Sequence, residues 1–238
     1  MTRNNIPIIF LFTILTSWCN GQYRDAGLWA DFTCSAELNK KWQLGISPEI
    51  RLDENLSRLS RAFVDISLQR KITKQITTTA TYRCGAARAN DLYDFRQRLQ
   101  FGVGIKDKFG DFVLGLQSRW QLGLRSLTPE GDADFVTTFR NKAQIKYTGL
   151  KGIDLATSFE IFNNSSQYGG LQMQNWRWTG GIEKKINKRN YITLGYLIQK
   201  DLLESPQELD YVILLSYQYE FNLKKKEEKT APEEIKEP

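Results

Sequence analysis

"FRQRLQFGVGI", residues 95–105, alternates two kinds of side chain at every second position. The first set is apolar and consists of Phe95, Leu99, Phe101, Val103 and Ile105. The second set combines charge, amide and glycine and consists of Arg96, Arg98, Gln100, Gly102 and Gly104. Because successive side chains of a β-strand point to opposite faces, this period of two predicts a strand with one apolar and one polar face.

The same alternation recurs from residue 27 to residue 221 and predicts an all-β chain. Strands are expected near residues 27–38, 42–52, 62–72, 76–84, 95–106, 112–122, 139–147, 153–162, 176–185, 191–199 and 211–221. Most are about ten residues long, the length that a tilted strand needs to cross a bilayer. Short polar turns, such as 187–190, alternate with long loops, such as 53–61, 85–94 and 123–138. Outer-membrane barrels have this asymmetry, with short periplasmic turns and long outer loops.

The polar face decides between two kinds of barrel. It joins glycines to long charged side chains, as in a crowded lumen, whereas tryptophan and tyrosine lie near strand ends on the apolar face, as in interfacial girdles. The expected girdle residues are Trp42, Tyr82, Trp120, Tyr147, Trp176, Tyr191 and Tyr211. The sequence therefore predicts a transmembrane antiparallel up-and-down β-barrel, and a secreted sandwich or lipocalin-like barrel is the alternative.

Two features complicate this barrel. Eleven segments are visible, but bacterial single-chain barrels have even strand numbers, so twelve strands are expected and ten are the second choice. Pro48 lies inside an expected strand, where it cannot donate a ladder hydrogen bond, and a β-bulge is expected there. Cys34 and Cys84 fall on the apolar face and are expected to be two small apolar residues, with a disulfide as the alternative.

The chain divides into three regions. Residues 1–21 have a basic start, an apolar core and small residues before a cut, which predicts a cleaved secretory signal peptide. A lipid anchor on Cys19 is the weaker alternative, since the bulky Trp18 precedes it. Residues 22–223 hold the expected barrel. Residues 224–238 are rich in Lys, Glu and Pro, which predicts a disordered tail.

Four stretches carry a family resemblance. They are residues 27–83, which begin "GLWADFTCSAELNKKWQLGISPEIRL", then "YDFRQRLQFGVGI", "FRNKAQIKY" and "INKRNYITLGYLIQ". Together they resemble the Bacteroidota outer-membrane β-barrel family catalogued as domain of unknown function 2490. The resemblance covers essentially the whole mature chain and rests on turn and strand patterns. It implies a barrel in the cell outer membrane and brings no established activity.

The last expected strand contains "LLSYQYEF", residues 214–221. This segment resembles the C-terminal signal strand by which barrels are handed to the barrel-assembly machinery. The resemblance implies that Tyr217, Tyr219 and Phe221 face the outer-membrane lipid. The charged tail that follows departs from the common pattern, in which the terminal aromatic residue ends the chain.

Composition narrows the functional classes. The chain has no histidine, which removes the Ser-His-Asp triad, the Asp-His site of barrel proteases and every His-ligated metal site. We therefore expect no enzyme activity and no cofactor. The net charge of +6 is spread along the chain without forming a block, so nucleic-acid binding is not expected.

Charged residues on the polar face form the candidate site. The basic members are Arg51, Arg83, Arg96, Arg98, Arg119, Arg140, Lys142, Lys146 and Arg177. The acidic members are Glu49, Asp65, Asp154, Glu160, Glu183 and Glu220. Because an unpaired ion away from bulk water is costly, most should pair across the lumen and narrow it. The basic excess predicts a small conductance that prefers small anionic solutes, and the alternative is a structural or partner-binding protein with a blocked lumen.

Overall fold

The computed structural model describes residues 24–89, 92–125, 134–165, 170–203 and 209–222. The expected signal peptide and charged tail lie outside these residues. None of the described residues forms a helix long and apolar enough to span a membrane.

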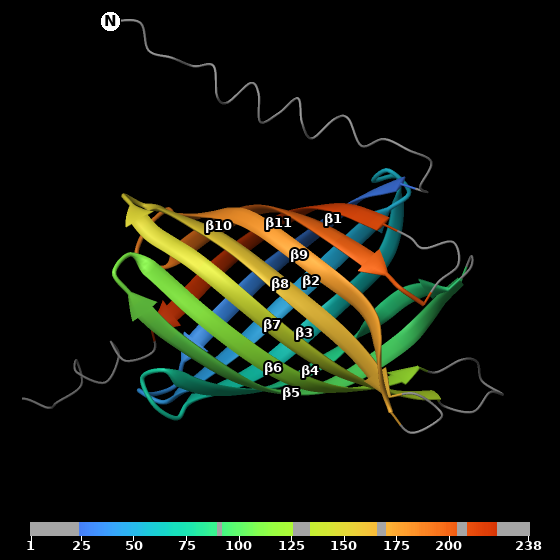
Figure 1. Ribbon diagram of the computed structural model, residues 1–238, viewed down its shortest axis with the longest axis horizontal. Helices are drawn as coiled ribbons and strands as arrows, with labels where there is room; N and C mark the ends of the chain where they lie inside the picture. The colour runs from blue at the N-terminus through green and yellow to red at the C-terminus, as the bar shows by residue number, and fades with distance from the viewer. Residues whose placement is uncertain (1–23, 90–91, 126–133, 166–169, 204–208, 223–238) are drawn as a thin grey trace, which may run out of the picture.

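The structure consists of eleven strands among the described residues. The elements are β1 (Arg24–Glu37), β2 (Trp42–Asp53), β3 (Arg58–Lys71), β4 (Ile76–Ala89), β5 (Leu92–Phe109), β6 (Phe112–Arg125), β7 (Asp134–Leu150), β8 (Ile153–Ser165), β9 (Leu171–Lys185), β10 (Asn190–Asp201) and β11 (Leu209–Asn222). The strands follow one another around a closed barrel and are steeply tilted (Figure 1), so the all-β barrel is confirmed.

The barrel closes through a parallel pair. β1 and β11 pair in parallel along all of β1, from Arg24 opposite Leu209 to Glu37 opposite Asn222, whereas every other neighbouring pair is antiparallel. The described strands therefore number eleven, and the expected twelve is not confirmed. In an up-and-down barrel with an odd number of strands, the first and last strands run in the same direction, so closure has to be parallel. As a consequence, β1 starts at one end of the barrel and β11 finishes at the other (Figure 1).

Two of the expected long loops are wrong. Most of 85–94 belongs to β4 and β5, which stay paired up to Ala89 opposite Leu92, and β3 already starts at Arg58. Small and polar residues in these segments still form ladder hydrogen bonds, because the ladder uses backbone groups. The longer connections that remain follow β6, β8 and β10.

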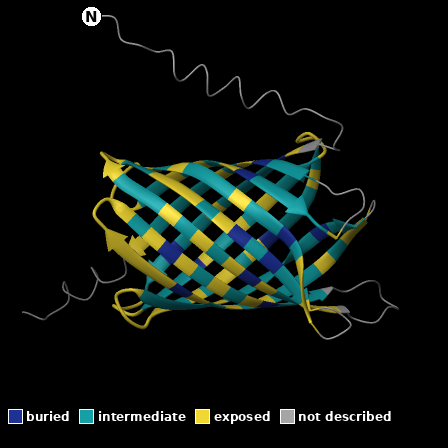
Figure 2. Ribbon diagram, viewed as in Figure 1, coloured by how far each residue is buried: buried dark blue, intermediate teal, exposed yellow. Residues whose placement is uncertain are grey.

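The two faces of the strands are arranged as the alternation predicts. Large apolar side chains are exposed on the outside, with Leu116 at 65% and Phe101 at 51% exposure. The inside holds buried polar residues such as Gln121 and Glu160, each at 4%. Figure 2 shows exposed and less exposed residues alternating along the strands. Tyr191 is an exception to the expected girdle, because it shares its face with Leu197, which is almost fully buried.

Pro48 does not produce the expected bulge. Asp31 pairs with Glu49 and Cys34 with Ile46, so the register between β1 and β2 is the same on both sides of Pro48. The missing donor interrupts the ladder without requiring an extra residue. The register shift between β2 and β3 lies instead at Arg51.

Cys34 and Cys84 are both free, as the preferred sequence interpretation holds. They lie on β1 and β4, which are separated by two other strands of the barrel. No disulfide therefore links them in the structure.

A glycine on β4 allows one aromatic ring to enter the lumen. A Cβ atom on Gly85 would lie 2.1 Å from the carbonyl oxygen of Ala62 and 2.9 Å from the ring of Phe63. Phe63 is buried on the inner side of β3, directly opposite Gly85. Only glycine lets these two strands approach so closely.

We predict that Gly85→Ala lowers the free energy of unfolding by about 1–3 kcal/mol, because the added methyl group must displace backbone or the Phe63 ring. Denaturant titration of the barrel in detergent micelles measures this change. Gly123→Ala is the matched control, since its Cβ would meet only the Val136 carbonyl oxygen at 3.6 Å. Equal stability of the two variants would show that the close approach is not a constraint.

Candidate functional site in the lumen

Arg83 is the centre of the first charge cluster in the lumen. Its guanidinium on β4 donates to both carboxylate oxygens of Asp65 on β3, at 2.6 and 2.7 Å, and to Glu49 on β2, at 2.8 Å. Glu49 also pairs with Arg51 on its own strand. These charge-assisted hydrogen bonds, about twice as strong as neutral ones, connect three neighbouring strands inside the barrel.

Glu160 is the centre of the second cluster. Its carboxylate on β8 accepts two hydrogen bonds from Arg140 on β7, at 2.8 and 3.1 Å, and a further one from Arg119 on β6. Arg177 on β9 lies 3.8 Å from the same carboxylate. One buried acid therefore holds three arginines from three strands.

A third cluster has the opposite composition. Lys146 on β7 places its Nζ atom 2.8 Å from Asp154 on β8 and 2.8 Å from Glu183 on β9. Asp154 and Glu183 are directly opposite each other in the ladder. Here one cation bridges two acids that would otherwise repel each other.

Aromatic rings link the first cluster to the second. The guanidinium of Arg51 lies 3.6 Å from the centre of the Trp29 ring on β1, and that of Arg177 lies 4.8 Å from the same ring. Arg177 is also 4.8 Å from the ring of Phe162 on β8, which Arg140 contacts at 4.4 Å. Each contact has the geometry of a cation–π interaction.

Phe63 extends the same series toward β4. Its ring lies 4.8 Å from the Arg83 guanidinium and 5.9 Å from that of Arg51. The result is a continuous series of alternating cations and rings, which we call the arginine–aromatic stack; its members are Arg83, Phe63, Arg51, Trp29, Arg177, Phe162 and Arg140.

One contact of the arginine–aromatic stack joins two strands that are not neighbours in the barrel wall. Trp29 belongs to β1 and Arg177 to β9, and β10 and β11 lie between these strands in the wall. Leu197 and Val212, inward residues of those two strands, are paired with each other and almost fully buried. The contact between Trp29 and Arg177 therefore runs through the lumen and covers an apolar patch of the inner wall.

Most of the predicted lumen charges come together, and a few do not. The two large clusters contain Arg51, Arg83, Arg119, Arg140, Arg177, Glu49, Asp65 and Glu160. Glu183 belongs to the separate Lys146 cluster, Arg96 lies 3.9 Å from Asp94, and Glu220 accepts a hydrogen bond from Gln218. Arg98 belongs to none of these groups.

The three rings of the stack were not singled out from the sequence. A signal was present, because Trp29, Phe63 and Phe162 occupy positions whose parity matches the polar face. An aromatic residue on the polar face of a barrel strand cannot contact lipid and has to pack inside.

The predicted assembly strand lies at the parallel seam. Tyr217 on β11 stacks on Phe32 of β1, with ring centres 5.6 Å apart, and Tyr219 contacts Phe221 edge to face at 4.5 Å. Phe221 is exposed on the outside. These contacts place the three aromatics on the outer surface, and their role in assembly stays a prediction.

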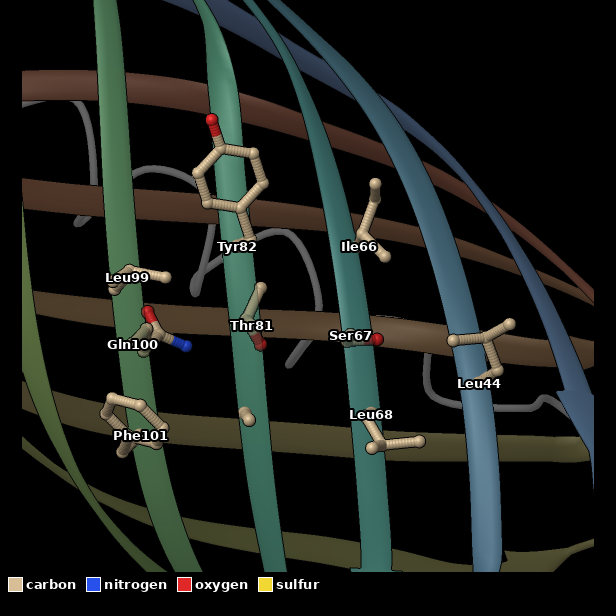
Figure 3. Close-up of a pocket in the computed structure, with 10 residues that line it drawn as sticks. Leu44, Ile66, Ser67, Leu68, Thr81, Tyr82, Leu99, Gln100 and Phe101 are labelled. Carbon is tan, nitrogen blue, oxygen red and sulfur yellow. The ribbon is translucent and has the colours of Figure 1, made fainter.

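Two shallow grooves lie on the outer wall. The first, of about 200 Å³, lies between Leu44, Leu68, Tyr82 and Phe101 (Figure 3), and the small residue Ala80 also lines it. The second, of about 590 Å³, adjoins it and reaches Trp42, Trp120 and Phe139. Both are lined mainly by outward apolar side chains and share no residue with the lumen clusters except Arg119 in the second.

Among the described residues, no group of three or more acidic or cysteine side chains is placed to hold a metal ion. Arginine or lysine engages Glu49, Asp65, Asp154, Glu160 and Glu183, whereas Asp31 accepts hydrogen bonds from Ser216 and Thr33. The arrangement can bind and orient charge.

The model of a family described as "Protein of unknown function (DUF2490)" matches residues 26–209, well over half of the chain. No curated protein matches the chain.

We predict that Glu160→Gln lowers the free energy of unfolding by about 3 kcal/mol or more, because it leaves Arg119 and Arg140 buried without their counter-ion. Chemical denaturation in micelles measures the loss. Glu54→Gln is the control: Glu54 pairs with Arg58 and Arg88 at a more exposed position, where such a pair contributes about 1 kcal/mol at most. Similar losses for both variants would contradict a central role for Glu160.

Proposed function

Because the chain belongs to the DUF2490 family, whose description assigns no activity, we propose a function from the barrel itself. The protein is an outer-membrane β-barrel with a constricted lumen that admits small anions slowly. The observation that carries this proposal is an apolar outer wall combined with a basic interior, which the arginine–aromatic stack crosses. The expected signal peptide and the family resemblance point to the same membrane.

The outer wall supports membrane insertion. Large apolar side chains are exposed on strands all around the barrel, for example Ile50 on β2, Phe101 on β5, Phe159 on β8 and Leu215 on β11. A water-soluble monomer rarely exposes such a continuous apolar surface, whereas a bilayer requires one. The two outer grooves would then be filled by lipid chains.

We predict that Leu116→Arg costs about 2–4 kcal/mol of folding free energy in a bilayer, because it places a charge against lipid. Gln117→Arg, on the opposite face of the same strand, should cost much less. The folded fraction is measured by heat-modifiable migration on a gel after folding into vesicles. Equal loss of the folded band in both variants would overturn the assignment of the outer face to lipid.

The interior supports restricted passage of anions. Arginines outnumber carboxylates in the two large clusters, and the excess positive charge lowers the energy of an anion relative to a cation. The stack crosses the lumen between β1 and β9, so a permeating solute has to pass beside Trp29. The second candidate function is a structural or partner-binding barrel, and the continuity of the stack favours it if no current flows.

Planar-bilayer recording tests these two functions. We predict that the unmodified barrel carries a small, anion-selective current and that Trp29→Ala raises it several-fold, because the central ring of the stack is lost. Trp120→Leu on the outer wall is the control and should leave the current unchanged. A large cation-selective current from the unmodified protein would refute the constricted lumen, and silence of all three proteins would favour the structural function.

A further inference from the structure

Cross-strand pairs of like charge recur on the inner wall. Arg119 on β6 is directly opposite Arg140 on β7, and Asp154 on β8 is directly opposite Glu183 on β9. Like charges in this position repel each other. Each pair is bridged by one opposite charge, Glu160 for the arginines and Lys146 for the acids.

A third pair lacks such a bridge. Arg83 on β4 is directly opposite Arg98 on β5, and of these two arginines only Arg83 pairs with Asp65 and Glu49. Within the described chain, Arg98 makes no side-chain hydrogen bond or ion pair. Its guanidinium is therefore not neutralised by any residue that the structure describes.

The charged residues around Arg98 add to the uncompensated positive charge. The charges that act on it most strongly are those of Arg83, Arg140, Arg51 and Arg61, and all four are positive. Arg61 differs, because the acids Glu49, Asp53 and Asp210 act on it as well. Arg98 thus has arginines on several sides and no acid among its strongest charged neighbours.

The bridged arginine pair shows which residue is missing. Glu160 lies on the strand after Arg140, two residues before Phe162, the register partner of Arg140. The equivalent position for Arg98 is two residues before its partner Gly123, and that position is Gln121. Gln121 is buried, faces the lumen and donates to Gln100, so a neutral amide stands where the other pair has a carboxylate.

There is also open space beside Gly123, the residue opposite Arg98. A Cβ atom on Gly123 would meet only the Val136 carbonyl oxygen, at 3.6 Å. The wall beside Arg98 is therefore bare, and nothing from β6 fills the position that a side chain would take.

We propose that the lumen contains a binding site for a small oxyanion, a carboxylate or a phosphate, held by Arg98 next to Arg83 beside Gly123. The bound oxyanion takes the place that Glu160 fills between Arg119 and Arg140. The two-oxygen face of a carboxylate or phosphate matches the fork of a guanidinium. The site rests on the proposed function only in that the solute must reach the lumen.

Calorimetric titration of the purified barrel in micelles tests the site, with inorganic phosphate and succinate as probes at constant ionic strength. We expect saturable binding of at least one probe, weakened tenfold or more by Arg98→Gln and weakened less by Arg98→Lys, which keeps the charge but loses the two-pronged donor. Arg70→Gln, which changes an arginine beside Trp42 outside the lumen clusters, should bind like the unmodified protein. Absence of binding of both probes, or unchanged binding by Arg98→Gln, would overturn the proposal.

Gln121→Glu gives a second test, which adds a carboxylate next to Arg98 instead of removing the arginine. It supplies an internal carboxylate at the position equivalent to Glu160, so we expect a higher unfolding midpoint without added anion and loss of probe binding. A variant that binds phosphate or succinate as tightly as the unmodified protein would contradict the bridging geometry. If the barrel binds a probe but carries no current, the oxyanion site is supported and the proposed channel function is refuted. If it carries an anion current but binds neither probe, the channel is supported and the oxyanion site is refuted.

Discussion

Charge balance in a closed lumen is the constraint on which the rest of the structure depends. Each barrel strand presents alternate residues to an interior that bulk water reaches poorly, so an inward charge needs a partner from another strand. Glu160 shows the consequence, since it connects arginines of β6, β7 and β9. The backbone ladder sets the spacing of the strands, and the side-chain pairs determine how much of the lumen they fill.

The parallel seam determines how these charges meet. Because eleven strands close with β1 beside β11, Trp29 is brought into the same region of the lumen as Arg177 of β9. An additional strand at the seam would move β1 farther from β9 and separate that cation from its ring. The stack and the odd strand count are therefore parts of one arrangement.

The sequence predicts the local features well and the closure poorly. The alternation in 95–105 assigns Arg98 and Phe101 to opposite faces, because facing depends only on parity. The strand number was expected to be even, a rule drawn from other barrels that no local pattern can test. The partners of Arg83, and the lack of a partner for Arg98 among the described residues, depend on register between strands, which a single strand does not encode. The parity of Trp29 predicts that it faces inward, but its contact with Arg177 joins strands that are far apart in sequence.

Arginine, and not lysine, dominates the stack for a physical reason. A guanidinium can place its flat face on an aromatic ring while its edge donates to an acid, and Arg140 does both, contacting Phe162 at 4.4 Å and Glu160 at 2.8 Å. An ammonium has no flat face to stack. Lys146 accordingly bridges Asp154 and Glu183 with no ring contact among the described residues. Replacement of a stack arginine by lysine would keep the charge and the ion pair but lose the flat contact with the ring. The stack therefore requires arginine itself and not only a positive charge.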